Sequence, residues 1–121
     1  MQELYCVIYR YLETYCQGRE NAIKFSDLGS KISLEAVPWR EVAGAIEQLR
    51  LQGKPIATCQ KGAFIPATAE EKRACLRTIY RRALNTLKTV KALQASFGNQ
   101  IVQEVSKEFD LTATGQFALK I

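Results

Sequence analysis

Residues 42–56 have the sequence VAGAIEQLRLQGKPI, in which a helical pattern ends at a glycine and a β-prone run follows. The large apolar residues recur at steps of four and three, the period of one helix face: Val42, Ile46 and Leu49. Gly53 has the place of a C-terminal cap, since glycine readily adopts the left-handed conformation there. Pro38 suits the first helical turn, where its missing N–H leaves no bond unmade. We therefore predict a helix over residues 38–52.

A β-hairpin is predicted directly after this helix. Residues 55–59 and 63–66 are two short β-prone runs. Residues 60–62 (Gln-Lys-Gly) lie between them, and a three-residue link that contains glycine favours a hairpin.

Two further helices are predicted ahead of residue 38. Over residues 2–16, apolar side chains recur at steps of three and four: Leu4, Ile8, Tyr11, Leu12 and Tyr15. Residues 22–25 alternate and predict a brief strand. Ser26-Asp27 then offers an N-cap for a short helix over residues 26–32.

A long helix is predicted after the hairpin. Thr68 is an N-cap residue and Glu71 follows at capping-box spacing, so the helix begins there and extends to about residue 95. Its basic residues share one side: Arg73, Arg77, Arg81 and Lys88. A second amphipathic helix is predicted over residues 101–109. Residues 111–121 form a tail whose order the sequence leaves open.

The predicted order of helix, short strand, helix, helix, hairpin and long helix is that of a winged helix-turn-helix with a C-terminal helical extension, a mainly α (α+β) fold. We expect residues 1–67 to form the winged helix-turn-helix domain and residues 68–110 to form the extension. The extension either belongs to the same compact unit or is an arm for dimerisation.

Residues 24–94 also resemble a known family. A motif V-x-x-x-I-x-x-L-R-x-x-G-x-P-I followed by G-x-aromatic is present as Val42, Ile46, Leu49, Arg50, Gly53, Pro55, Ile56, Gly62 and Phe64. It resembles the N-terminal DNA-binding domain of the biotin operon repressor, and more closely the small winged-helix proteins of phages and prophages. The resemblance implies DNA binding. The chain departs from the family at Pro38-Trp39, where Ser-Arg is usual, and at Gly44, where a basic residue is usual.

The charge distribution also favours a polyanionic partner. The net charge is +5. Residues 1–53 carry six basic and seven acidic side chains, a net charge of −1, whereas residues 54–121 carry eleven and five, a net charge of +6. Such a one-sided basic field is typical of nucleic-acid binding, although a solvated helix face gives the same pattern.

No catalytic or metal-binding motif is present, so we expect neither an enzyme nor a cofactor or metal. The chain has no histidine, and its four cysteines form no closely spaced pair. We interpret Cys6, Cys16, Cys59 and Cys75 as small buried hydrophobes in a reducing compartment. No apolar run approaches a membrane span and the N-terminus does not resemble a signal peptide, so we expect a cytoplasmic protein that does not contact membranes.

Candidate DNA contacts follow from the predicted helix at 38–52, the hairpin and the long helix. The candidates for base contacts are Trp39, Arg40, Ala43 and Glu47. The candidates for phosphate contacts are Lys54, Gln60, Lys61, Arg73, Arg77 and Arg81. Trp39 either contacts DNA or a partner, or packs against Leu34 and Val37 to close a small core. Arg50 is expected to brace the end of its helix or an acidic partner.

Two functions remain open. The first is binding of double-stranded DNA as a transcriptional regulator or a phage or prophage accessory protein. The alternative is a winged-helix protein–protein interaction module, an adaptor with little DNA affinity. The apolar side of the long helix either forms a helical hairpin, mediates a homodimer through the C-terminal helices, or packs on the helix at 2–16.

Overall fold

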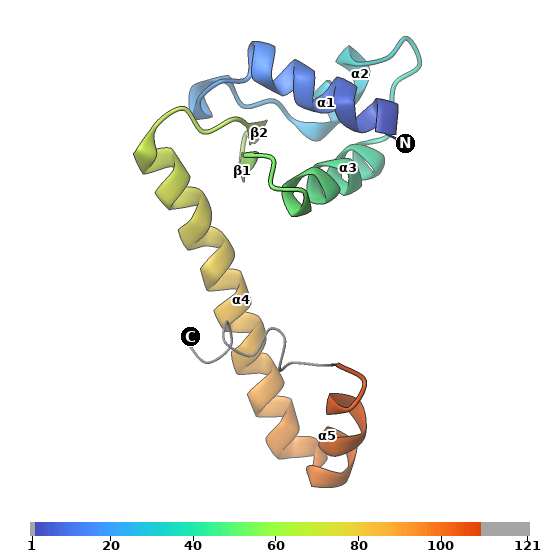
Figure 1. Cartoon of the computed structure of the whole chain (residues 1–121), viewed down its shortest axis with the longest axis vertical. Coiled ribbons are helices and arrows are strands. Elements are labelled where there is room, and N and C mark those ends of the chain that lie inside the picture. The colour runs from blue at the N-terminus through green and yellow to red at the C-terminus, as the bar shows by residue number, and fades with distance from the viewer. Residues whose placement is uncertain (1, 110–121) are drawn as a thin grey trace. The chain divides into compact units, whose positions relative to one another are not determined.

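The computed structural model describes residues 2–109, and the tail predicted at residues 111–121 lies outside them. The elements are helix α1 (Gln2–Tyr15), the 3₁₀ turn η1 (Arg19–Asn21), helices α2 (Phe25–Lys31) and α3 (Trp39–Leu51), strands β1 (Ala57–Cys59) and β2 (Gly62–Phe64), and helices α4 (Ala69–Phe97) and α5 (Asn99–Ser106) (Figure 1). The described chain is mostly helical with a small two-stranded antiparallel sheet, which confirms the α+β class.

The chain divides into two compact units within α4. The first unit ends at Leu76 and the second begins at Arg77.

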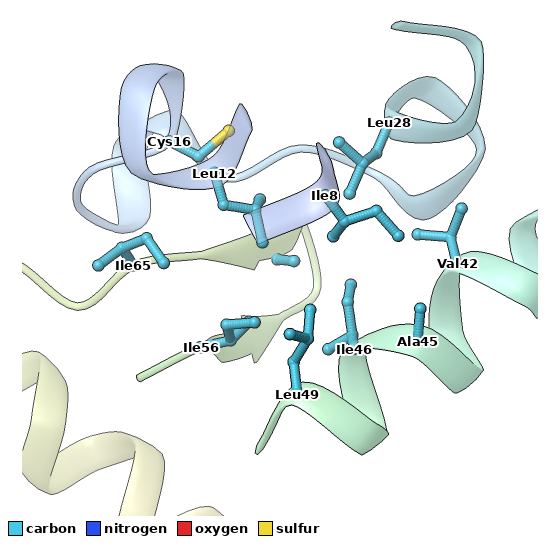
Figure 2. Close-up of a cluster of buried hydrophobic side chains, with 11 residues drawn as sticks. Ile8, Leu12, Cys16, Leu28, Val42, Ala45, Ile46, Leu49, Ile56 and Ile65 are labelled. Carbon is cyan, nitrogen blue, oxygen red and sulfur yellow. The ribbon is translucent and has the colours of Figure 1, made fainter. Parts of the chain in front are cut away.

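The first unit is held together by one apolar core. Helix α3 packs against both α1 and α2, and the hairpin closes the cluster from another side (Figure 2). The largest fully buried side chains are Ile8, Leu12, Leu28, Val42 and Ile46. Burying one such side chain stabilises a fold by about 1.5–3 kcal/mol, so the spacing of apolar residues in α1 and α3 sets this arrangement.

In the connection from α2 to α3, the backbone of Val37 lies close to the backbone of Gly29 in α2. The Val37 N–H donates to the Gly29 carbonyl at 3.1 Å. A Cβ on Gly29 would overlap the carbonyl of Val37, so only glycine allows α2 to lie this near the start of α3.

The strand predicted at residues 22–25 is longer than the one observed. Ile23 forms an isolated antiparallel bridge with Ala63, and Phe25 already begins α2. The predicted N-cap at Ser26 is wrong as well, because Lys24 has the N-cap position and makes no side-chain cap bond. Only one residue of this segment is bridged. An alternating pattern of that length is too short to show in the sequence where a strand ends and a helix begins.

The hairpin is confirmed with a shorter turn than predicted. Cys59 pairs with Gly62, so Gln60 and Lys61 alone form the turn. The Ile23 N–H donates to Ala63 O at 3.0 Å and the Ala63 N–H donates to Ile23 O at 2.9 Å. These two bonds attach β2 to the segment before α2, so the hairpin is joined to the helical core along one edge.

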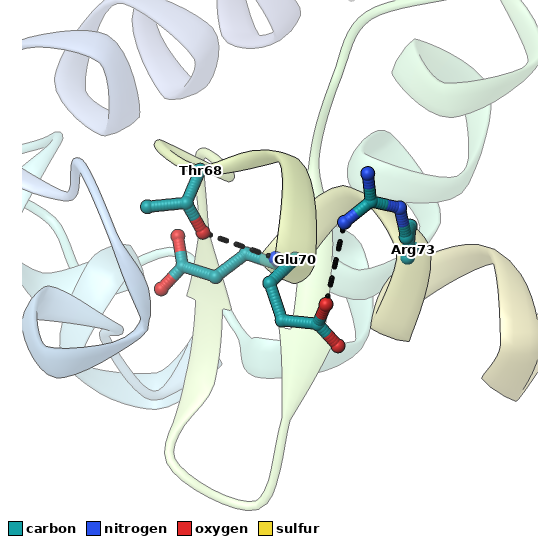
Figure 3. Close-up of polar contacts among 4 residues, drawn as sticks. Thr68, Glu70 and Arg73 are labelled. Atoms are coloured by element: carbon teal, nitrogen blue, oxygen red, sulfur yellow. Dashed lines mark hydrogen bonds and ion pairs between the residues drawn. The ribbon is translucent and has the colours of Figure 1, made fainter.

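The predicted capping box begins α4. The Glu71 N–H donates to Thr68 Oγ1 at 3.1 Å (Figure 3). The Glu71 carboxylate accepts the backbone N–H of Ala67 at 2.8 Å and that of Arg19 at 2.9 Å. Hydrogen bonding from Arg19, then from Ala67, lowers the pKa of Glu71 below its ordinary value of 4.5. Glu71 therefore joins the start of α4 to the turn after α1.

We expect Glu71→Gln to destabilise the first unit in a pH-dependent way. The folded state lowers the pKa of this carboxyl, so its contribution is present above the pKa of the unfolded chain and is lost as pH falls through the folded pKa. Urea unfolding across a pH series should show the largest difference from the wild type near neutrality and a shrinking difference below about pH 4.5. Glu70→Gln is the control, because Glu70 and Arg73 form a largely exposed pair at 3.4 Å. An equal deficit at every pH would contradict the prediction.

The second unit contains the rest of α4 and α5. Gly98 separates them with φ 92°, and α5 begins two residues before the predicted start at residue 101. No described residue of α4 or α5 is buried.

Candidate nucleic-acid interface

Helix α3 presents one face to solvent because its other face is fixed in the core. Val42, Ala45, Ile46 and Leu49 are buried. The exposed side chains are Trp39, Arg40, Glu41, Glu47, Gln48 and Leu51, with Gly44 exposed among them and Ala43 half-buried. All four predicted base-contact residues therefore lie on accessible parts of one helix.

Trp39 lies at the start of α3 and is 53% exposed. The guanidinium carbon of Arg40 lies 5.4 Å from the centre of its ring, a cation–π distance. The alternative in which Trp39 packs against Leu34 and Val37 to close a small core is not observed with Leu34, because Leu34 is fully exposed and Val37 packs against the main core instead. The indole and the guanidinium therefore form a joint exposed group at the N-terminal end of α3.

An open pocket of about 330 Å³ joins the start of α3 to the hairpin turn. It brings together two predicted residues, Trp39 and Gln60. Its other lining residues are Lys24, Phe25, Ser26, Cys59 and Gly62. Lys24 and Ser26 were not predicted as site residues, since a bridge between distant segments, Ile23–Ala63, brings them to the hairpin.

Lys54 lies away from this pocket. Its ammonium is 5.2 Å from the centre of the Tyr9 ring of α1, in a second open pocket of about 520 Å³. Burial and the nearby Glu13 carboxylate raise the pKa of Tyr9 above its ordinary value of 10.0. Lys61 is exposed in the turn between the strands. The two lysines therefore lie in different parts of the first unit, Lys54 beside α1 and Lys61 in the hairpin turn.

Arg50 points to α4 rather than to the end of its own helix. Its Nη2 lies 3.9 Å from the sulfur of Cys75, and the side chain is half-buried. The expected interaction of Arg50 with the carbonyl groups at the end of α3 is not observed; the side chain contacts Cys75 instead. Arg50 is a structural contact within the first unit.

The cysteines differ from their interpretation as buried hydrophobes. Cys16 alone is buried, and burial raises the pKa of its thiol. Cys6 is exposed, and Cys59 and Cys75 are half-buried. Within residues 2–109, no three Cys, Asp or Glu side chains converge as a metal site would require.

The basic residues of α4 lie along its exposed surface. From Lys72 to Phe97 the helix carries seven basic side chains and no acidic one: Lys72, Arg73, Arg77, Arg81, Arg82, Lys88 and Lys91. Arg73 pairs with Glu70, with both side chains more than half exposed (Figure 3). None of the described helices is long and apolar enough to cross a bilayer.

Comparison of the chain with protein-family models, curated proteins and solved structures gives no match in any of the three. The family resemblance of residues 24–94 therefore stays a prediction. Because one fold supports many functions, the features that bear on function are the exposed face of α3, the hairpin turn and the charge of α4.

Proposed function

We propose that the protein binds double-stranded DNA as a winged helix-turn-helix regulator or a phage or prophage accessory protein. Helix α3 enters the major groove and the hairpin turn lies beside the phosphate backbone. The observation that carries this proposal is the shared pocket of Trp39 and Gln60, which places the start of an exposed helix next to a polar hairpin turn.

The dimensions and surface of α3 support groove binding. The helix has thirteen residues, and its exposed face carries Arg40 near the N-terminal end, the end that commonly contacts base edges. Gly44 lies in the middle of this face, and a Cβ there would meet no atom within 4 Å. A glycine inside a helix costs about 0.5–1 kcal/mol relative to alanine. Nothing in the first unit requires that cost at Gly44, whereas close approach of a duplex to the helix backbone would.

The hairpin supplies groups suited to phosphates. Gln60 and Lys61 are exposed in the turn, and Lys24 lines the same pocket as Gln60. Such groups position a protein on the duplex without reading sequence. Arg73, Arg77 and Arg81 of α4 add further phosphate contacts, so binding should depend strongly on salt.

We expect titration with duplex DNA to change the fluorescence of Trp39 and to weaken as salt rises. Trp39 is the only tryptophan in the chain, so its emission reports on the start of α3 alone. Affinity measured by anisotropy of labelled DNA should fall with a log–log slope of about −0.9 for each phosphate contacted. Salt-dependent binding without a change at Trp39 would remove α3 from the interface.

A second candidate function is supported by the charge of α3. The exposed charged residues of α3 are Arg40, Glu41 and Glu47, so its exposed face is not positive. Trp39 and Leu51 add exposed apolar surface. Such a face suits a protein partner. The adaptor function predicts negligible duplex binding even at low salt, and that result in the titration would replace the DNA proposal.

A further inference from the structure

Helix α4 carries a strict seven-residue repeat that none of the proposed DNA contacts uses. From Leu76 onward, residues recur at alternating steps of three and four: Leu76, Ile79, Ala83, Thr86, Val90, Leu93 and Phe97. We call these seven residues the heptad stripe. Six of the seven are apolar, and the repeat covers three heptads, the length at which such a pattern indicates a coiled coil.

The heptad stripe is uncovered in the described chain. Five of its large side chains are 40–58% exposed: Leu76, Ile79, Val90, Leu93 and Phe97. All but Leu76 lie in the second unit, where α5 leaves them accessible. An aligned apolar stripe of this length on a soluble helix is typical of an interface.

The charges of α4 lie where a paired helix would leave them in solvent. Arg81 and Lys88 occupy the heptad position opposite the stripe, and Arg77 and Lys91 occupy another outer position. The residues that flank the stripe are Tyr80, Leu87 and Gln94 on one side and Arg82, Thr89 and Ser96 on the other. In coiled coils, charged residues at the flanking positions determine which helix is accepted as a partner. Among the flanking residues of the heptad stripe, only Arg82 is charged.

We propose that the heptad stripe pairs with the same stripe of a second copy of this chain, the two α4 helices running parallel. In a parallel pair Arg82 of one copy lies opposite Leu87 of the other, so the single flanking charge meets no like charge. The four outer basic residues of each copy stay accessible. The proposal concerns self-association and holds whether or not the protein binds DNA.

The mass of the full chain in solution tests the pairing. Light scattering after size exclusion should give twice the monomer mass of 13.6 kDa at high concentration and a decline towards 13.6 kDa on dilution. Leu93→Glu should weaken self-association by at least about a hundredfold, because each dimer loses two apolar contacts. Asn85→Glu makes the same change of charge on an exposed outer position and should leave the dimer intact.

Two results would overturn the proposal. One is a mass of 13.6 kDa at every concentration, as expected if residues 110–121 or a different protein covered the stripe. The other is equal association of Leu93→Glu and Asn85→Glu. Leu93 is 45% exposed in the single chain, so the variant should fold, and circular dichroism checks this. A dimer that does not bind DNA would refute only the DNA function, and a monomer that binds DNA would refute only the pairing.

The direction of pairing has its own test. In a parallel dimer, Ile79→Cys places the two introduced thiols opposite each other. Oxidation with copper phenanthroline should therefore form a disulfide between the two copies at this position. Asn85→Cys should not cross-link to itself. Peptide mapping separates these bridges from any formed by the four native cysteines. A dimer in which Ile79→Cys cross-links no better than Asn85→Cys would exclude parallel pairing.

Discussion

Gly62→Ala should destabilise the first unit by about 3 kcal/mol or more, the largest effect we expect from adding a single methyl group. Gly62 has φ 124°, where a Cβ costs roughly 1–2 kcal/mol. The added Cβ would also overlap the carbonyl of Ile23 and lie close to the N atom of Lys24. Both are backbone atoms, so neither can rotate away as a flexible side chain could. The substitution should separate β2 from the segment before α2.

Two other glycines make this a controlled experiment. Gly53 has φ 90° but no atom within 4 Å of a built Cβ, so Gly53→Ala should cost only the backbone strain of roughly 1–2 kcal/mol. Gly44 has an ordinary helical backbone and open space around it, so Gly44→Ala should stabilise the fold by about 0.5–1 kcal/mol. Urea unfolding followed by circular dichroism measures all three. Equal losses for Gly62→Ala and Gly53→Ala would show that the approach of Ile23 to Gly62 does not constrain the fold.

Elements with a complete local pattern were predictable from the sequence. Helix α3 follows the spacing of Val42, Ile46 and Leu49, and it ends just before Gly53, as predicted. Thr68 accepts the Glu71 N–H as the capping-box spacing predicts, and the Glu71 carboxylate reaches back to the N–H of Ala67, the residue before Thr68. These features depend on neighbours in sequence, and the sequence displays them directly.

Features that depend on distant segments were missed. The Glu71 carboxylate accepts a bond from Arg19, fifty-two residues away, and the sequence signals only its local partners. Lys24 enters the candidate site because Ile23 pairs with Ala63, a bridge one residue long. Leu34 and Cys6 are exposed although both are apolar. A unit of this size has few buried positions, so apolar character alone does not show which residues are buried.

Reversing two charges on α4 should weaken duplex binding by about a hundredfold or more, since two charge-assisted phosphate contacts of about 1.5 kcal/mol each become repulsive. The variant is Arg77→Glu with Arg81→Glu, two exposed residues one turn apart on the same side of the helix. The log–log slope of affinity against salt should also become shallower by about two. Anisotropy of labelled duplex across a salt series measures both quantities.

The control changes the net charge equally without altering that side of α4. Arg82→Glu with Lys107→Glu also reverses two exposed basic residues, and Arg82 lies about 100° around the helix from Arg81. If α4 binds phosphates through the side that carries Arg77 and Arg81, the control should keep most of the wild-type slope. If both variants lose affinity and slope to the same extent, these basic residues act only through the net charge of the protein. If neither variant changes the slope, the phosphate contacts come from the first unit alone, and Lys24 and Lys61 become the residues to reverse next.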